Sequence, residues 1–288
     1  MLRGSREDWV VRVPASSANL GSAFDAVALA LDVHLEVTAV ETNALGVAAP
    51  GSEPAPENHP AVRAFRQAGG VGPIAVRARF PGGRGLGYSG AARVGGLVAA
   101  CVQQGGSLRA SRTAILQQAG DLEGHSDNAA ASLFGGIVAV AGGRAVRIPI
   151  PRDLAVVVWI PDRETSTPSA RRLLPDQVSL EDATFNIGRA ALLVAALAAG
   201  DVDALRTATE DRLHQDRRLA RSRDTRLAMD AALAAGAYAA WVSGSGPAAA
   251  ALVEPNRAHE VAAALPGDGR THVVAIAETG ATVTTRDV

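Results

Sequence analysis

Apolar and polar residues alternate strictly over residues 31–38, LDVHLEVT, which predicts a strand with one buried face. Residues 74–80, IAVRARF, alternate in the same way and end in a Pro-Gly-Gly turn. The short β-branched run at residues 9–13 predicts another strand, which we expect to end at Pro14 because proline cannot donate to a strand ladder. Residues 42–60 are rich in Gly, Pro, Ala and Glu, and this composition predicts a loop.

Helical segments and short apolar runs fill the rest of the chain. The predicted helices cover residues 61–67, 110–120, 185–199, 202–222 and 256–265, besides one that follows a glycine-rich loop within 81–102. The predicted strands cover residues 136–140, 155–160, 237–242, 248–253 and 272–276. Strands cluster before about residue 150 and alternate with helices after it. The pattern therefore predicts a mixed α+β protein with two lobes, residues 1–150 and 151–288.

Composition and charge narrow the function classes. The chain has 288 residues, of which 48% are hydrophobic and 20% charged, as in an ordinary globular protein. Its 28 basic and 29 acidic residues leave a net charge of −1, which argues against nucleic acid as the partner. Every basic residue is Arg, so a Schiff-base lysine and a Walker A loop are excluded. A single cysteine, Cys101, excludes an intramolecular disulfide.

Long apolar segments are few. No run reaches ~18 apolar residues without a charge, so we expect no membrane partner. The first residues, MLRGSREDW, carry no apolar stretch of the kind that a signal peptide has. The expected location is the cytoplasm.

The segment Gly82–Gly90, GGRGLGYSG, follows a predicted strand and opens a helix. Glycines allow its backbone N–H groups to turn inward, and the N-terminal end of the helix favours an anion. The segment therefore predicts a phosphate loop, in which the Ser89 hydroxyl would bind Mg²⁺ or a phosphate oxygen. A plain turn before a core helix would fit the same letters.

Two other segments favour a nucleotide. Glu123 lies in DLEGHSDN, and a carboxylate beside a serine hydroxyl is an oxygen donor set that suits Mg²⁺. The alternative for Glu123 is a charge at the surface end of a helix. The segment SGSGP at residues 243–247 predicts a tight turn between two strands, and a simple hairpin connection is the alternative.

Six segments in this order resemble the GHMP small-molecule kinases and, within them, the homoserine kinases. They are VPASSANLGSAFDAVALAL, PGGRGLGYSGAA, EGHSDNAAASLFGG, STPSARRLLP, DRLHQDRR and SGSGPAAAAL, and they run from about residue 11 to 253. Each one is short, and it is their shared order along most of the chain that is specific.

The resemblance implies a fold and an activity. The fold is an N-terminal lobe like the second domain of ribosomal protein S5 with a ferredoxin-like C-terminal lobe. The activity is transfer of the γ-phosphate of ATP to the side-chain hydroxyl of L-homoserine, with Mg²⁺, giving O-phospho-L-homoserine for threonine synthesis. Catalysis without a dedicated side-chain base is also implied, by positioning and by neutralisation of phosphate charge.

The resemblance also assigns roles to residues of this chain. The nucleotide would lie on Asn58, Pro81, Gly83, Gly85, Leu86, Gly87, Tyr88, Ser89 and Gly90. Ser89 and Glu123 would hold the metal, and Asn128 would lie near the reacting phosphate. The amino acid would be held by Asn19, Asp25, Thr167, Arg171 and Arg218. Two guanidinium groups suit a carboxylate, and Asp25 suits an ammonium group.

Some of these residues have simpler interpretations. Asp25 could cap a helix. Arg218 lies in an arginine-rich segment whose members would ordinarily face solvent, and it shares a helix face with His214, for which a structural role is favoured. Asn58 could be an ordinary loop residue.

The chain departs from the family pattern at several positions. Ala23 stands where the first motif has a glycine, which would cost roughly 1 kcal/mol or more if that position were left-handed. Tyr88 and Gly90 replace a serine and an alanine of the phosphate loop, and a tyrosine there could crowd the nucleotide. Asp216 and Arg217 replace a Pro-Tyr pair.

Two rival functions follow. One is a GHMP kinase that acts on another small alcohol, such as L-threonine or a sugar. The other is a non-catalytic homologue that senses nucleotide or amino acid. Many members of the family are dimers, so a homodimer is an open option, although no apolar stripe predicts one.

Overall fold

The computed structural model describes residues 8–40 and 53–286. Most of the predicted loop at 42–60 lies outside the described residues. The N-terminal lobe is a six-stranded sheet in the order β10-β1-β2-β4-β5, with β3 paired to β2. Its strands are β1 (Asp8–Ala18), β2 (Val27–Ala39), β3 (Ile74–Ala78), β4 (Ile137–Ala141), β5 (Arg144–Ile148) and β10 (Thr282–Arg286).

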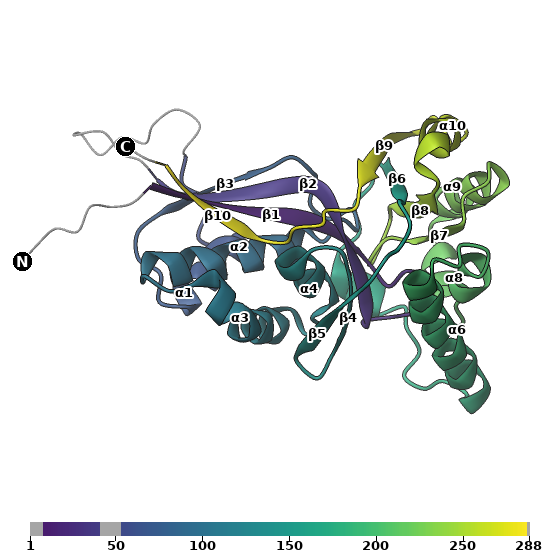
Figure 1. Cartoon of the computed structure of the whole chain (residues 1–288), viewed down its shortest axis with the longest axis horizontal. Helices are drawn as coiled ribbons and strands as arrows, with labels where there is room; N and C mark the ends of the chain where they lie inside the picture. The colour runs from purple at the N-terminus through teal and green to yellow at the C-terminus, as the bar shows by residue number, and fades with distance from the viewer. Residues whose placement is uncertain (1–7, 41–52, 287–288) are drawn as a thin grey trace, which may run out of the picture.

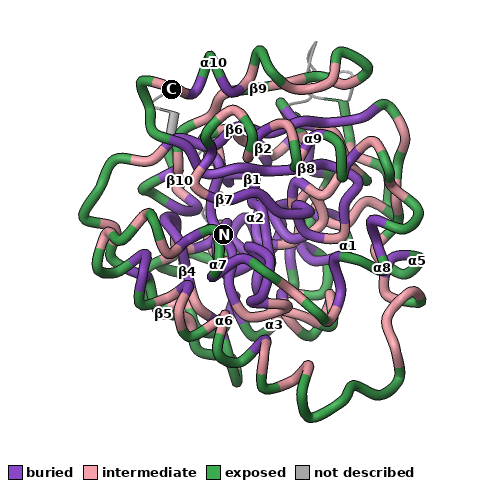
Figure 2. Tube along the Cα trace, turned by 90° about the vertical axis from the view of Figure 1, so that its right-hand side faces the viewer, coloured by how far each residue is buried: buried purple, intermediate pink, exposed green. Residues whose placement is uncertain are grey.

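Four helices cover one face of this sheet, as Figure 1 shows: α1 (Pro60–Gln67), α2 (Tyr88–Gln103), α3 (Leu108–Glu123) and α4 (Asp127–Phe134). Helix α2 is buried along most of its length, because it lies between the sheet and the other helices (Figure 2). Gly96 allows α2 to approach α1 closely, since a Cβ there would overlap the Ala61 carbonyl. This packing fixes the glycine-rich loop that precedes α2.

The C-terminal lobe is a four-stranded sheet in the order β7-β8-β6-β9. Its strands are β6 (Ala155–Pro161), β7 (Ala239–Val242), β8 (Ala249–Val253) and β9 (Gly269–Ala275). Its helices are α5 (Thr167–Arg171), α6 (Leu180–Ala199), α7 (Leu205–Ala208), α8 (Gln215–Leu219), α9 (Arg223–Ala234) and α10 (Ala258–Ala263), with a 3₁₀ turn at Pro255–Arg257. Every residue of β6 and β8 is buried.

The two sheets meet at the middle of β2. Leu31 forms an isolated bridge with Ile276, and the Ala277 amide donates to the Ala30 carbonyl at 3.0 Å. The chain then returns to the first lobe, where β10 pairs with β1 (Figure 1). The division of the chain into residues 1–150 and 151–288 stays a prediction. The last strand, β10, lies in the sheet of the first lobe.

Several predicted elements differ from the structure. Strand β1 continues through Pro14, and the prediction that it ends there is wrong because a register shift after Pro14 accommodates the missing N–H. The predicted helix at 202–222 is also wrong, because the chain breaks between α7 and α8. At that break the Asp211 carboxylate accepts from the amides of His214 and Gln215 at 2.8 and 2.7 Å, which starts α8. The elements α4, β5, α5, α9 and β10 were not predicted.

Helix α6 is long and apolar enough to cross a membrane by length and composition alone. A single helix of this kind is a weak indication, because helices of soluble proteins pass the same test. Leu193 and Leu197 of α6 are buried in the main hydrophobic core, and 22% of the apolar window of this helix is buried.

Candidate active site

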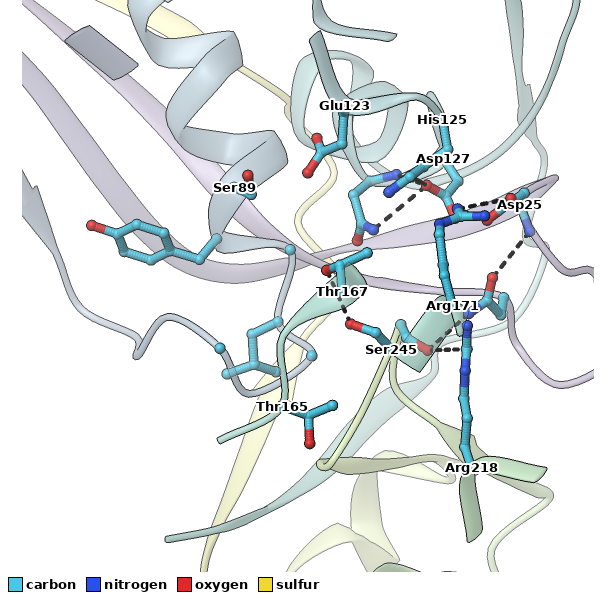
Figure 3. Close-up of a pocket in the computed structure, with 18 residues that line it drawn as sticks. Asp25, Ser89, Glu123, His125, Asp127, Thr165, Thr167, Arg171, Arg218 and Ser245 are labelled. Carbon is cyan, nitrogen blue, oxygen red and sulfur yellow. Dashed lines mark hydrogen bonds and ion pairs between the residues drawn. The ribbon is translucent and has the colours of Figure 1, made fainter. Parts of the chain in front are cut away.

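A cavity lies where the two lobes meet, and segments from both lobes line it (Figure 3). The predicted site residues that line it are Asn19, Asp25, Gly83, Gly85, Leu86, Gly87, Tyr88, Ser89, Glu123, Asn128, Thr167, Arg171 and Arg218. The other lining residues are His125, Asp127, Thr165, Gly244 and Ser245. The predicted residues Asn58, Pro81 and Gly90 are not among the lining residues, and Asn58 is exposed in the turn before α1.

The glycine-rich loop takes the shape that its composition predicts. Gly83, Gly85 and Gly87 all have positive φ, and Gly87 is the first residue outside helix α2. A Cβ at Gly87 would overlap the Ser16 hydroxyl, so only glycine fits there. No side chain caps α2, so its first amides stay available to an anion at the cavity.

Tyr88 is held at the side of the loop. The His59 ring accepts from the Ala61 amide through Nδ1 and donates through Nε2 to the Tyr88 hydroxyl at 2.9 Å. Burial lowers the pKa of His59, which favours this neutral form, and burial raises the pKa of Tyr88. The Tyr88 ring also packs edge-on against Phe80. These contacts anchor the tyrosine to α1 and to the strand end before the loop.

Glu123 and Ser89 come from the end of α3 and the start of α2 (Figure 3). The Arg93 guanidinium joins them, because its Nη1 lies 3.0 Å from Glu123 Oε1 and also donates to the Ser89 hydroxyl. Burial raises the pKa of Glu123, and the positive charges of Arg93 and His125 oppose this shift. Arg93 was not predicted as a site residue, although its position one helical turn after Ser89 was a signal.

A divalent cation fits this pair of residues. Glu123 Oε2 is buried and has no hydrogen-bond partner within the described chain. A carboxylate oxygen and a serine hydroxyl are the hard donors that Mg²⁺ prefers. Asp25, His125 and Asp127 also place ligand atoms within 4.8 Å of one another, but Asp25 and His125 already have partners there.

His125, Asp127 and Asn128 form the wall at the start of α4. The His125 Nδ1 donates to Asp127 Oδ1 at 2.7 Å. Burial would lower the pKa of His125, but the hydrogen bond and the charge of Asp127 outweigh it and raise that pKa. The Asn128 amide N–H also donates to Asp127, and its side-chain oxygen accepts from Ser16 at 2.9 Å. His125 and Asp127 were not predicted, although both lie in the EGHSDN motif.

The segment between β1 and β2 presents Asp25 to the cavity. Asn19, Leu20, Gly21 and Asp25 are the left-handed residues of this segment, and Ala23 is not one of them. The strain expected at Ala23 is therefore absent. The Asn19 side-chain oxygen accepts from the Asp25 amide at 3.0 Å, which stabilises the turn. Asp25 lies outside any helix, so the helix-cap interpretation is wrong.

Arg171 and Arg218 approach Asp25 from the C-terminal lobe (Figure 3). Arg171 Nη2 lies 2.8 Å from both Asp25 oxygens, and this pair is about one-third exposed. Arg218 is buried rather than solvated, and its Nη1 donates to the Gly244 carbonyl at 2.8 Å. Burial lowers its pKa to about 10. Both guanidinium carbons lie about 5.5 Å from the ring centre of Phe24, a contact that the sequence did not predict.

His214 holds the guanidinium of Arg218 in position. Its Nε2 donates to the Gly21 carbonyl at 2.7 Å, so its Nδ1 is free to accept from Arg218 Nη1 at 3.1 Å. Burial lowers the pKa of His214 to about 4. The ring is therefore neutral at pH 7 and serves as a structural link between two lobes.

Thr165, Thr167 and Ser245 complete the cavity from the C-terminal lobe (Figure 3). The Thr165 amide donates to the Gly83 carbonyl at 2.9 Å, and the Thr167 and Ser245 hydroxyls lie 3.3 Å apart. Backbone contact between the lobes thus fixes the glycine-rich loop beside these hydroxyls.

Comparison with known proteins agrees with this geometry. Residues 58–136 match the family model of the GHMP kinases N terminal domain, and residues 193–270 match that of the GHMP kinases C terminal. The homoserine kinase of Thermus thermophilus is 42% identical over 280 residues, covering 92% of this chain and 95% of that protein. This chain belongs to the GHMP kinases. Enzymes of the family use ATP as the phosphate donor, and the predicted two-lobed fold class is confirmed.

Other GHMP kinases match over nearly the whole chain. The homoserine kinase of Streptomyces coelicolor is 40% identical over 290 residues, covering 95% of this chain and 93% of that protein. A putative homoserine kinase of Listeria monocytogenes has a TM-score of 0.77 and 27% identity, covering 96% of this chain and all of that one. The homoserine kinase of Cytophaga hutchinsonii, with a TM-score of 0.80 and 24% identity over 99% of both chains, supports the fold.

Proposed function

We propose that this GHMP kinase transfers the γ-phosphate of ATP to the side-chain hydroxyl of L-homoserine, giving O-phospho-L-homoserine for threonine synthesis. The observation that carries the proposal is the position of the Asp25–Arg171–Arg218 group beside the phosphate loop in one cavity. The named relatives support the same substrate.

The charged group suits a zwitterionic amino acid. Arg171 and Asp25 pair with each other and are partly exposed. An α-carboxylate can take the guanidinium of Arg171 while an α-ammonium group takes Asp25, so that one ion pair is replaced by two. Arg218 adds a second guanidinium, and the polar side chains of Asn19 and Thr167 also line the cavity. A neutral sugar offers no charged group to Asp25 or to either guanidinium, so it would gain none of these charge-assisted contacts.

The nucleotide side has its own donors. The amides of Gly83, Gly85, Gly87 and the first turn of α2 would bind the phosphates. Ser89 and Glu123 would hold Mg²⁺, which supplies positive charge to the transferring phosphate. Asn128, fixed by Ser16, would orient that phosphate toward the hydroxyl of the substrate. Binding and orientation by these residues would then supply the catalysis.

An assay of ADP release with L-homoserine, L-threonine and L-serine tests the proposal. We expect turnover with L-homoserine at least tenfold above the other two in kcat/KM, and O-phospho-L-homoserine as the product. Turnover that favours L-threonine would assign the other substrate. ATP binding without turnover on any of the three would favour the sensor.

A further inference from the structure

Arg93 lies between the two residues that would bind the metal. It follows Ser89 by one turn of α2, and its side chain is 18% exposed. One guanidinium nitrogen contacts both Glu123 Oε1 and the Ser89 hydroxyl. A single cation of this chain thus bridges the same two oxygen donors that a divalent cation would use.

The buried carboxylate of Glu123 is stabilised by a positive charge beside it. Its side chain is 9% exposed, and a buried carboxylate without a partner is strongly destabilising. Among the described residues, Arg93 is the side chain that forms an ion pair with it. The second oxygen, Oε2, is buried and unpartnered, so the carboxylate retains capacity for a further cation. Arg93 therefore offsets the negative charge of Glu123 through Oε1 and leaves Oε2 of Glu123 available.

We propose that Arg93 is the resident cation of this site: in the nucleotide-free protein it holds Glu123 and Ser89 together and disfavours binding of a free divalent cation. A divalent cation then enters together with the nucleotide phosphates, whose negative charge offsets the guanidinium. The inference rests on the proposed function only in that a metal–nucleotide complex is the ligand.

Coulomb repulsion sets the expected size of the effect. A divalent cation on Glu123 would lie within a few ångströms of the Arg93 charge, and at that range even well-screened charges change an affinity on the order of tenfold. Removal of the Arg93 charge leaves a buried carboxylate with one partner fewer, which adds to the attraction for a cation. The affinity for free metal should therefore rise when Arg93 is neutralised, whereas the loss of a merely structural contact would not raise it.

The test measures Mn²⁺ binding to nucleotide-free protein by electron paramagnetic resonance, which counts the free ion. We expect Arg93→Gln to bind Mn²⁺ at least about tenfold more tightly than the natural protein. Arg93→Lys keeps the charge and should bind as weakly as the natural protein. The double variant Arg93→Gln/Glu123→Gln should lose the added affinity. Arg109→Gln, an exposed arginine on α3, controls for the general loss of one positive charge.

Thermal unfolding supplies a second readout. The melting temperature of Arg93→Gln should fall in the absence of metal and rise with Mn²⁺, whereas that of the natural protein should not respond. If Arg93→Gln folds only with Mn²⁺, the inference is supported, and failure of Mn²⁺ to restore folding overturns it. Equal Mn²⁺ affinity in the natural protein and in Arg93→Gln also overturns it. None of these measurements depends on turnover, so a failure of the proposed reaction would be seen separately.

Discussion

The Ser243 hydroxyl donates a hydrogen bond of 2.6 Å to the carbonyl of Gly85. Ser243 precedes the turn between β7 and β8, and Gly85 is in the glycine-rich loop, so this bond joins the two lobes directly. Ser17 lies 2.8 Å from Ser243 and accepts from the Trp241 indole at 3.0 Å. Because Ser243 is fully buried, the orientation of its hydroxyl is fixed by this chain of donors.

We therefore expect Ser243→Ala to lower the free energy of unfolding by about 1–3 kcal/mol, because the variant leaves the Gly85 carbonyl without its donor. The loop should also bind the phosphates less well, which raises KM for ATP several-fold with little change in KM for the amino acid. Urea unfolding and initial-rate kinetics measure the two effects. Ser107→Ala, at the exposed residue before α3 whose side chain makes no capping hydrogen bond, is the control and should leave KM for both substrates unchanged.

Glu123→Gln should lower kcat by about 100-fold or more, because the variant removes a charged ligand that stabilises the developing phosphate charge. The Gln side chain keeps the size of Glu, and so the packing around α3 should survive. Rates at increasing Mg²⁺ concentrations, compared with the exposed Glu181→Gln, measure the effect. Turnover equal to that of the natural protein would refute the role of Glu123.

The shape of the glycine-rich loop could be predicted from the sequence, because it depends on neighbouring residues. A glycine-rich loop before a helix brings backbone amides together by short-range geometry alone, and Ser89 lies in the first turn of that helix. Arg93 could have been found in the same way, from its i,i+4 spacing to Ser89.

The cluster of Asp25, Arg171 and Arg218 is formed by contacts between segments that are distant in the sequence. Asp25 and Arg171 meet across 146 residues, and no periodicity records this pairing. Arg218 is buried because α8 packs beside Gly244, whose carbonyl accepts from its guanidinium. The arginine-rich sequence of residues 202–222 does not indicate this burial. The same segment was wrongly predicted as one helix, because the chain breaks there and the Asp211 carboxylate accepts from the amide of Gln215, the first residue of α8.

Arg218→Lys should raise KM for the amino acid by about 10-fold or more and leave KM for ATP unchanged. The guanidinium binds the Gly244 carbonyl and lies over the Phe24 ring, and an ammonium group cannot present the same planar set of donors. The neighbouring Arg217 is exposed, so Arg217→Lys is the matched control. An unchanged KM for the amino acid would show that Arg218 does not bind its carboxylate.

The state of His214 should make stability depend on pH. Its pKa is about 4 in the folded protein, below the ordinary value of 6.5, because burial disfavours the charged ring. Between these two values the unfolded chain binds a proton that the folded chain does not bind. The free energy of unfolding should therefore fall as the pH falls from 6.5 to 4, by up to about 3 kcal/mol from this group.

Urea unfolding of the natural protein and of His214→Gln at pH 7.5 and at pH 4.5 isolates this contribution. The variant should be less stable at pH 7.5, because its amide replaces only part of the link between the Gly21 carbonyl and Arg218. It should lose less stability on acidification than the natural protein, since it lacks the titrating ring. The exposed His272→Gln should follow the natural protein at both pH values. Equal losses in the natural protein and in His214→Gln would mean that His214 keeps an ordinary pKa in the folded state and that its link to Arg218 does not require the neutral ring.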